Sequence, residues 1–271
     1  MKIRAINYSL FFFLIVLSFS SCKFRKIEKS QDWRVKYEAA LQYYEEQDYY
    51  RSSILFESIL PIVRGLPEGE KVQFYLAYCQ YHEGLYILAS HQFKTFYESY
   101  GRSTYVQEAQ YMYAYSLYAD SPESNLDQKS SMEALAAMQN FLNKYPNSSY
   151  SEQTRNIIDE IQKKLEVKGY DNAFQYYKLK RYKAALVAFD NFSDEYPDSD
   201  LNENASYYKI MAQYDLAEQS IISVQLERYN EVKSLYESFI DRYPSSKFLS
   251  NAEKVYTDSL KKINELTGNK L

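Results

Sequence analysis

The sequence predicts an all-α fold, a solenoid of about five stacked helix pairs, and three observations support this prediction. A short phrase of Phe, Tyr and usually Pro begins at Phe96, Phe141, Phe192 and Phe239, and self-similarity at such intervals is typical of repeat arrays. The 271 residues include only 6 Gly and 6 Pro, which is little turn material for an all-β fold. They also include 31 Tyr and 15 Phe, which is ample aromatic material for packing helices together.

The first 21 residues indicate a secretory signal peptide. Basic residues at positions 2 and 4 precede the apolar run Leu10 to Leu17, which is too short to span a bilayer. The three residues before Cys22 resemble a bacterial lipobox, with Phe19 where Leu is usual. We therefore expect acylation of Cys22, which would make it the first residue of the mature protein and anchor the protein to a membrane. An ordinary cleaved signal, with Cys22 incidental, is the alternative.

The rest of the chain is expected to be a short linker and one repeat domain. Residues 22–32 would form the lipidated cysteine and a polar linker, and residues 33–271 the repeats. In the clearest repeat, Ala173 lies on a first helix, and Ala185 and Phe189 lie on a second helix that Pro197 ends. The second-helix pattern recurs in residues 86–100, 131–145 and 229–243, and a weaker first unit is expected to close at Pro61. Extra residues within 120–130 and 218–227 predict projecting loops or helix extensions.

The spacings of small, aromatic and Pro residues resemble those of tetratricopeptide repeats, whose stacked helix pairs form a concave surface that holds peptides or proteins. First helices line that surface. Placing the units in register directs ten residues toward this groove: Arg34, Tyr37, Tyr44, Lys71, Phe74, Tyr78, Tyr81, Tyr111, Tyr115 and Tyr118. This aromatic path, with two cations near its start, suits an extended segment that carries aromatic side chains and a free carboxylate. Packing between repeats is the alternative role for each ring.

The composition gives no support to catalysis, metal binding or nucleic-acid binding. With 32 basic and 36 acidic residues the chain lacks a broad basic surface, so we expect no nucleic-acid partner. His82 and His91 are the only histidines, and no zinc or nucleophile–base pattern accompanies them. The scattered glycines form no phosphate-binding loop. We therefore expect no enzyme, no catalytic residue, no metal and no cofactor, and we expect Cys79 to be a small buried hydrophobic residue.

The lipobox, the five tetratricopeptide-like units and the segment from Ser124 to Pro146 together resemble the BamD family of outer-membrane protein assembly lipoproteins. The resemblance covers nearly all of the mature chain. It implies a lipid-anchored outer-membrane protein that faces the periplasm, scaffolds the barrel-forming subunit BamA and helps deliver or recognise unfolded outer-membrane proteins. It also implies that the amino-terminal units contact substrates and that later units contact BamA.

Partner contacts and rival functions stay open at this point. Lys178, Lys180 and Arg181 fall at a turn between two helices and form a candidate contact for an acidic partner, with a solvated turn as the alternative. A tetratricopeptide lipoprotein that scaffolds peptidoglycan or division machinery would differ only in its partners. A nutrient-binding lipoprotein of the SusD type would be expected to have longer, ligand-bearing insertions than this chain.

Overall fold

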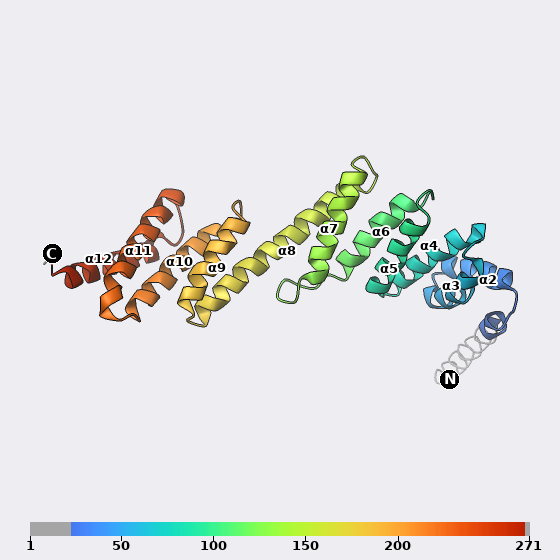
Figure 1. Ribbon diagram of the computed structural model, residues 1–271, viewed down its shortest axis with the longest axis horizontal. Helices are drawn as coiled ribbons and strands as arrows, with labels where there is room; N and C mark the ends of the chain where they lie inside the picture. The colour runs from blue at the N-terminus through green and yellow to red at the C-terminus, as the bar shows by residue number, and fades with distance from the viewer. Residues whose placement is uncertain (1–22, 269–271) are drawn as a thin grey trace, which may run out of the picture. The chain divides into compact units, whose positions relative to one another are not determined.

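The computed structural model describes residues 23–268, in which every regular element is a helix and no strand occurs. The prediction of an all-α solenoid of five helix pairs is confirmed, because consecutive helices pack as antiparallel pairs and one further helix follows (Figure 1). The pairs are α2 (Trp33–Glu45) with α3 (Tyr49–Val63), α4 (Pro67–His82) with α5 (Tyr86–Ser99), α6 (Val106–Ala119) with α7 (Lys129–Lys144), α8 (Ser151–Lys178) with α9 (Tyr182–Glu195), and α10 (Asn202–Glu218) with α11 (Ile222–Arg242); α12 (Leu249–Thr267) follows them.

The described chain forms two compact units. Unit 1 holds residues 23–122 and 127–161, and unit 2 holds residues 123–126 and 162–268. Helix α8 therefore supplies its first residues to unit 1 and its remaining residues to unit 2. In unit 1, Ile157 and Ile161 of this helix are buried, and in unit 2, Tyr170 and Ala173 belong to the core.

The cores consist largely of the residues that carry the sequence repeat. Ala89, Phe93 and Phe96 on α5 are almost completely buried, and so are the matching Ala185, Phe189 and Phe192 on α9. Small side chains allow the paired helices to approach, and the rings fill the remaining space, which removes apolar surface from water. At Gly169 on α8 the approach is so close that an added Cβ would lie 3.1 Å from the Tyr196 ring.

The recurring phrase builds the connection from one repeat to the next. The amide of its Tyr donates to the carbonyl of its Phe, and the amide of a Ser three residues later donates to the carbonyl of the Tyr. The Ser hydroxyl then accepts a hydrogen bond from the amide two residues further on, as in Tyr105 N to Ser103 Oγ at 3.0 Å and Phe248 N to Ser246 Oγ at 3.1 Å. The phrase therefore ends one helix and starts the next.

In three of the phrases the same Ser also bonds back to the first helix of the repeat that it closes. Ser103 donates to Glu70 Oε1 and Ser246 donates to Glu203 Oε1, each at 2.5 Å, and Ser199 donates to Glu166. Each acceptor lies on the first helix of the repeat that the phrase closes. We call these bonds the Ser–Glu connectors. The fourth phrase has Ser148, whose hydroxyl accepts from the amide of Tyr150 but has no carboxylate acceptor among the residues described.

Three features differ from the expectations or extend them. Helix α3 runs through Pro61 to the buried Val63, so the prediction that it closes at Pro61 was wrong by two residues. Within the expected linker, residues 23–28 are helical, and Phe24 and Ile27 pack against the core of α2 to α4. Of the two expected insertions, residues 120–128 form a loop, whereas the second lengthens α11 at its start.

Candidate functional site

The first helices of unit 1 each present half-buried tyrosines. We call this set the tyrosine path; it comprises Tyr37 and Tyr44 on α2, Tyr75, Tyr78 and Tyr81 on α4, and Tyr115 and Tyr118 on α6. The centroid of the Tyr44 ring lies 4.7 Å from that of Tyr75, and the Tyr81 ring lies 5.9 Å from the Tyr115 ring. Six of these seven residues were named from the sequence, and the structure brings them together; Tyr75 was missed.

Phe74 and Tyr111, which were also predicted to line the groove, do not line it. Each is only 4% exposed, so neither ring can offer a face to a ligand. The reason is that a ring at the start of the next first helix stacks on each of them: Tyr105 on Phe74 at 4.5 Å and Tyr150 on Tyr111 at 4.2 Å. For these two residues, packing between repeats is the correct interpretation.

The two predicted cations lie at the surface of unit 1. Arg34 and Lys71 are both exposed, on α2 and α4 respectively. The Arg34 guanidinium lies 4.6 Å from the centre of the Trp33 ring. The backbone amide of Arg34 donates to the side chain of Asp32, which caps α2. Both side chains are therefore accessible to an anionic group.

Glu108, which the sequence did not single out, lies among the tyrosines. It is half-buried in the first turn of α6, and the Tyr78 hydroxyl donates to its Oε1 at 2.5 Å. Burial and then the Glu108 charge raise the pKa of Tyr150. Burial chiefly, with Glu108 a smaller cause, also raises the pKa of Tyr44 and of Tyr75. Tyr78 therefore bonds directly to Glu108, and the charge of this carboxylate acts on three further tyrosines.

Other hydroxyls of the path are also held in their protonated, donating form. Burial and then a hydrogen bond to Glu160, at 2.7 Å, raise the pKa of Tyr118 to about 12. Burial and the neighbouring Tyr115 hydroxyl raise the pKa of Tyr81 to about 12. At neutral pH the path consequently offers uncharged rings and hydroxyl donors, with carboxylates beside them.

The predicted basic contact belongs to unit 2 and lies at the turn between α8 and α9. Lys178, Lys180 and Arg181 are all exposed there. Lys180 has φ 58°, in the left-handed region, as do Gln47 and Gly84 in the corresponding turns of two earlier repeats. A non-glycine residue is uncommon in this conformation.

Exposed apolar residues lie beside this basic turn. Leu179 is 58% exposed, and Ile221 and Ile222, at the start of α11, are 73% and 76% exposed. The turns α8–α9 and α10–α11 lie at the same edge of unit 2 (Figure 1). Burial raises the pKa of Asp215, near the end of α10, and the Tyr177 and Tyr182 hydroxyls beside the first of these turns act in the opposite direction. Basic and apolar groups together form one accessible edge.

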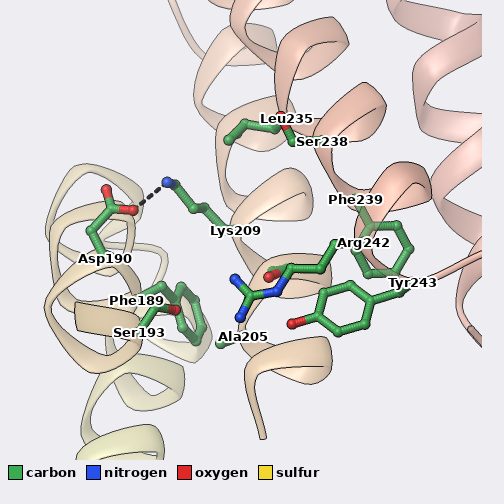
Figure 2. Close-up of a pocket in the computed structure, with 11 residues that line it drawn as sticks. Phe189, Asp190, Ser193, Ala205, Lys209, Leu235, Ser238, Phe239, Arg242 and Tyr243 are labelled. Atoms are coloured by element: carbon green, nitrogen blue, oxygen red, sulfur yellow. Dashed lines mark hydrogen bonds and ion pairs between the residues drawn. The ribbon is translucent and has the colours of Figure 1, made fainter. Parts of the chain in front are cut away.

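Unit 2 also has a hollow of about 270 Å³ between α9, α10 and α11 (Figure 2). The Arg242 guanidinium and the Tyr243 hydroxyl point into it, and Lys209 forms an ion pair with Asp190 at one side. A smaller hollow of about 120 Å³ occupies the matching place between α5, α6 and α7 in unit 1. Because the hollow recurs with different lining residues, it follows from the packing of repeats and does not by itself define a site.

The remaining sequence predictions concern the two cysteines, metal binding and membrane-spanning segments. Cys22 and the predicted signal peptide lie outside residues 23–268. Cys79 is fully buried, and burial raises the pKa of its thiol to about 12, which agrees with a packing role. Within the described part of the chain, no group of three or more His, Cys, Asp or Glu side chains could hold a metal ion. None of the helices placed in residues 23–268 combines the length and apolar character needed to cross a membrane.

The fold and the tyrosine path define a helical-repeat protein with an accessible aromatic surface. A comparison with protein families identifies the family. The family model YfiO, described as outer membrane lipoprotein, matches residues 30–171, which is just over half of the chain. The chain belongs to this family. The matched range includes the whole tyrosine path and Glu108 but not Cys22 or the basic turn. None of the curated proteins compared with the chain matches it.

Proposed function

We propose that this protein is a lipid-anchored, non-catalytic subunit of the outer-membrane β-barrel assembly machinery. In this role it would be acylated at Cys22, face the periplasm, scaffold a BamA-like barrel protein and help deliver or recognise unfolded outer-membrane proteins. The match to an outer membrane lipoprotein family over residues 30–171 carries the proposal. The repeat fold supports it, because stacked helix pairs are suited to holding other polypeptides.

The proposed substrate surface is the tyrosine path, with Arg34 and Lys71 beside it. Strands destined for a β-barrel carry apolar and aromatic side chains at alternate positions while they are unfolded. Half-buried tyrosine rings offer such side chains rigid contact area, and their hydroxyls can donate to an extended backbone. Arg34 and Lys71 would bind a carboxylate at one end of the segment.

The proposed partner contact is the edge of unit 2 that carries Lys178, Lys180 and Arg181. Accessible apolar groups at Leu179, Ile221 and Ile222 provide area to bury, and the basic residues provide charge for an acidic surface of the barrel protein. Apolar centres with polar or charged rims are typical of protein–protein interfaces.

Affinity purification from solubilised outer membranes tests the proposal. A tagged chain should recover a BamA-like barrel protein in near-equal amount, and Cys22→Ala should abolish acylation and membrane attachment. Recovery of cell-wall enzymes or a nutrient transporter without the barrel protein would contradict the function proposed above.

One variant set tests the partner contact within the same experiment. Lys178→Gln, Lys180→Gly and Arg181→Gln together remove three charges, and Gly suits the left-handed backbone at position 180. We expect this triple variant to fold normally and to lose most of the barrel protein. Lys144→Gln with Lys209→Gln, which removes cations from the two hollows, is the control and should retain it.

A further inference from the structure

The carboxylate of Glu108 lies half-buried among aromatic rings and has no cationic partner. Its one hydrogen bond among the described residues comes from the Tyr78 hydroxyl, and no Lys, Arg or His of residues 23–268 lies within ion-pair distance of it. Only fully buried carboxylates normally need a positively charged partner, so this half-buried group is stable unpaired and can still accept one. Glu108 is therefore free to pair with a cation that a ligand supplies.

Tyr78, which bonds to Glu108, and the three tyrosines on which the Glu108 charge acts come from three parts of unit 1. Tyr44 belongs to α2, Tyr75 and Tyr78 belong to α4, and Tyr150 directly precedes α8. The Tyr44 and Tyr75 rings are in edge contact, and Tyr150 is held by its stacking on Tyr111. Aromatic faces beside a carboxylate are the combination that binds ammonium and guanidinium groups, through cation–π attraction and charge.

We propose that Glu108, with Tyr44, Tyr75, Tyr78 and Tyr150, binds a Lys or Arg side chain of the extended segment that occupies the tyrosine path. This inference rests on the proposed function and deepens it by assigning the chemistry of one ligand residue. Glu108 and Tyr78 differ in role: Glu108 contacts the cation, and Tyr78 is a positioning residue that holds the carboxylate through its hydroxyl.

The register of the repeats makes the inference more specific. Arg34, Lys71 and Glu108 occupy the same place on α2, α4 and α6, each three residues before a path or packing ring at Tyr37, Phe74 and Tyr111. The charge at this place is positive in the first two repeats and negative in the third. A segment along the path would thus meet cations at one end and a carboxylate at the other, which selects the direction in which it binds.

A helix terminus provides the alternative explanation for Glu108. An acidic residue in the first turn of a helix is stabilised by the helix dipole, and Glu108 occupies that turn of α6. This role would account for the carboxylate but requires no ligand and no tyrosines. Glu203 is an example of this role, because it lies in the first turn of α10 and accepts a hydrogen bond from Ser246. If Glu108 served only the helix terminus, replacing it would not change ligand binding, whereas a cation site predicts that it would.

Peptide binding to the mature chain carrying Cys22→Ala tests the inference. The probes are three fluorescent peptides of alternating Tyr and Thr that differ only at a central residue, which is Lys, norleucine or Glu. We expect the Lys peptide to bind roughly tenfold more tightly than the norleucine peptide, and the Glu peptide to bind more weakly than both. The preference for Lys should decrease as salt is added.

Three variants distinguish ligand binding from stability. Glu108→Gln should reduce the Lys preference to about onefold and leave norleucine-peptide binding nearly unchanged. Tyr78→Phe should reduce the preference in part, because it removes the bond that orients the carboxylate. Glu160→Gln removes the matched acceptor of the Tyr118 hydroxyl and should leave the preference intact. Urea unfolding of each variant confirms that the fold is retained.

Several results would overturn the inference. It fails if the parent chain binds none of the peptides, if it binds the Lys and norleucine peptides equally, or if Glu108→Gln keeps the full preference. The membrane purification reports separately on the proposed function. If the chain prefers the Lys peptide but recovers no barrel protein, the proposed function is contradicted and the cation site is retained. If it recovers the barrel protein but shows no preference for Lys, the cation site is contradicted and the proposed function is retained.

Discussion

In three of the four recurring phrases, a single serine makes two hydrogen bonds that organise the connection between helices. Ser103, Ser199 and Ser246 each accept a backbone hydrogen bond that starts the next helix and donate to a glutamate of the preceding first helix. Burial acts to raise the pKa of Glu166, but bonds from Lys163 and Ser199 outweigh it and hold that pKa below its ordinary value. The bond from Ser199 therefore helps to keep Glu166 ionised.

The fourth phrase supplies an internal control for these connectors. Ser103→Ala and Ser246→Ala each remove a bond to a carboxylate and a bond from an amide, and we expect each to lower the free energy of unfolding by about 1–2 kcal/mol. Ser148→Ala removes only the bond from the Tyr150 amide and should cost about half as much. Urea unfolding followed by circular dichroism measures the difference. Equal losses at all three positions would mean that the glutamates contribute nothing.

The sequence could predict which residues are aromatic and periodic but not which of them stay accessible. Phe74 and Tyr78 are four residues apart on α4, and both suited the groove; the stacking of Tyr105 buries the first and leaves the second half-exposed. Glu108 could not be identified because its environment comes from α2, α4 and Tyr150, which are distant in sequence. Contacts between repeats decide both outcomes.

At the level of the element, the second helices were the most predictable part of the fold. Their small and aromatic residues recur at fixed spacing, and the structure buries them as expected. The continuation of α3 past Pro61 and the packing of Phe24 and Ile27 against the first core could not be predicted from periodicity. Helix α12 was not anticipated either, although Ala252 and Val255 on it complete the core that contains Val232 and Phe239.

Helix α9 offers a direct test of that burial. Phe189→Ala removes a ring that is 1% exposed, and we expect a loss of about 3–5 kcal/mol in the free energy of unfolding of unit 2. Val187→Ala, two residues away on the same helix, changes a side chain that is 59% exposed and should cost no more than about 0.5 kcal/mol. Comparable losses for the two variants would be inconsistent with the helix face described here.

At the level of the whole molecule, the many tyrosines make stability depend on alkaline pH. Burial raises the pKa of Tyr97, Tyr118, Tyr170 and Tyr196 to about 12, whereas an unfolded chain titrates near pH 10. Because the folded pKa values are raised, the stabilisation is fully present below about pH 10 and is lost as the pH rises through about 12.

Two measurements check this dependence. The urea midpoint should be nearly constant up to about pH 9 and should fall steeply above about pH 10. Tyrosinate absorbance of the folded protein should show a large fraction of rings that ionise only as the protein unfolds, whereas the same titration in concentrated urea should be complete near pH 10. A folded protein whose tyrosines all titrate as in urea would show that the rings are not buried as described.

The position of Trp33 has a practical consequence for studying this molecule. It is the only tryptophan of the chain, and it packs at the start of α2 against the core of unit 1, with Tyr37 and Arg34 beside it. Its fluorescence emission therefore reports on unit 1 alone, while the circular dichroism signal sums the helices of both units. Because Tyr37 and Arg34 belong to the proposed substrate surface, the same emission supplies a label-free optical reporter of what binds there.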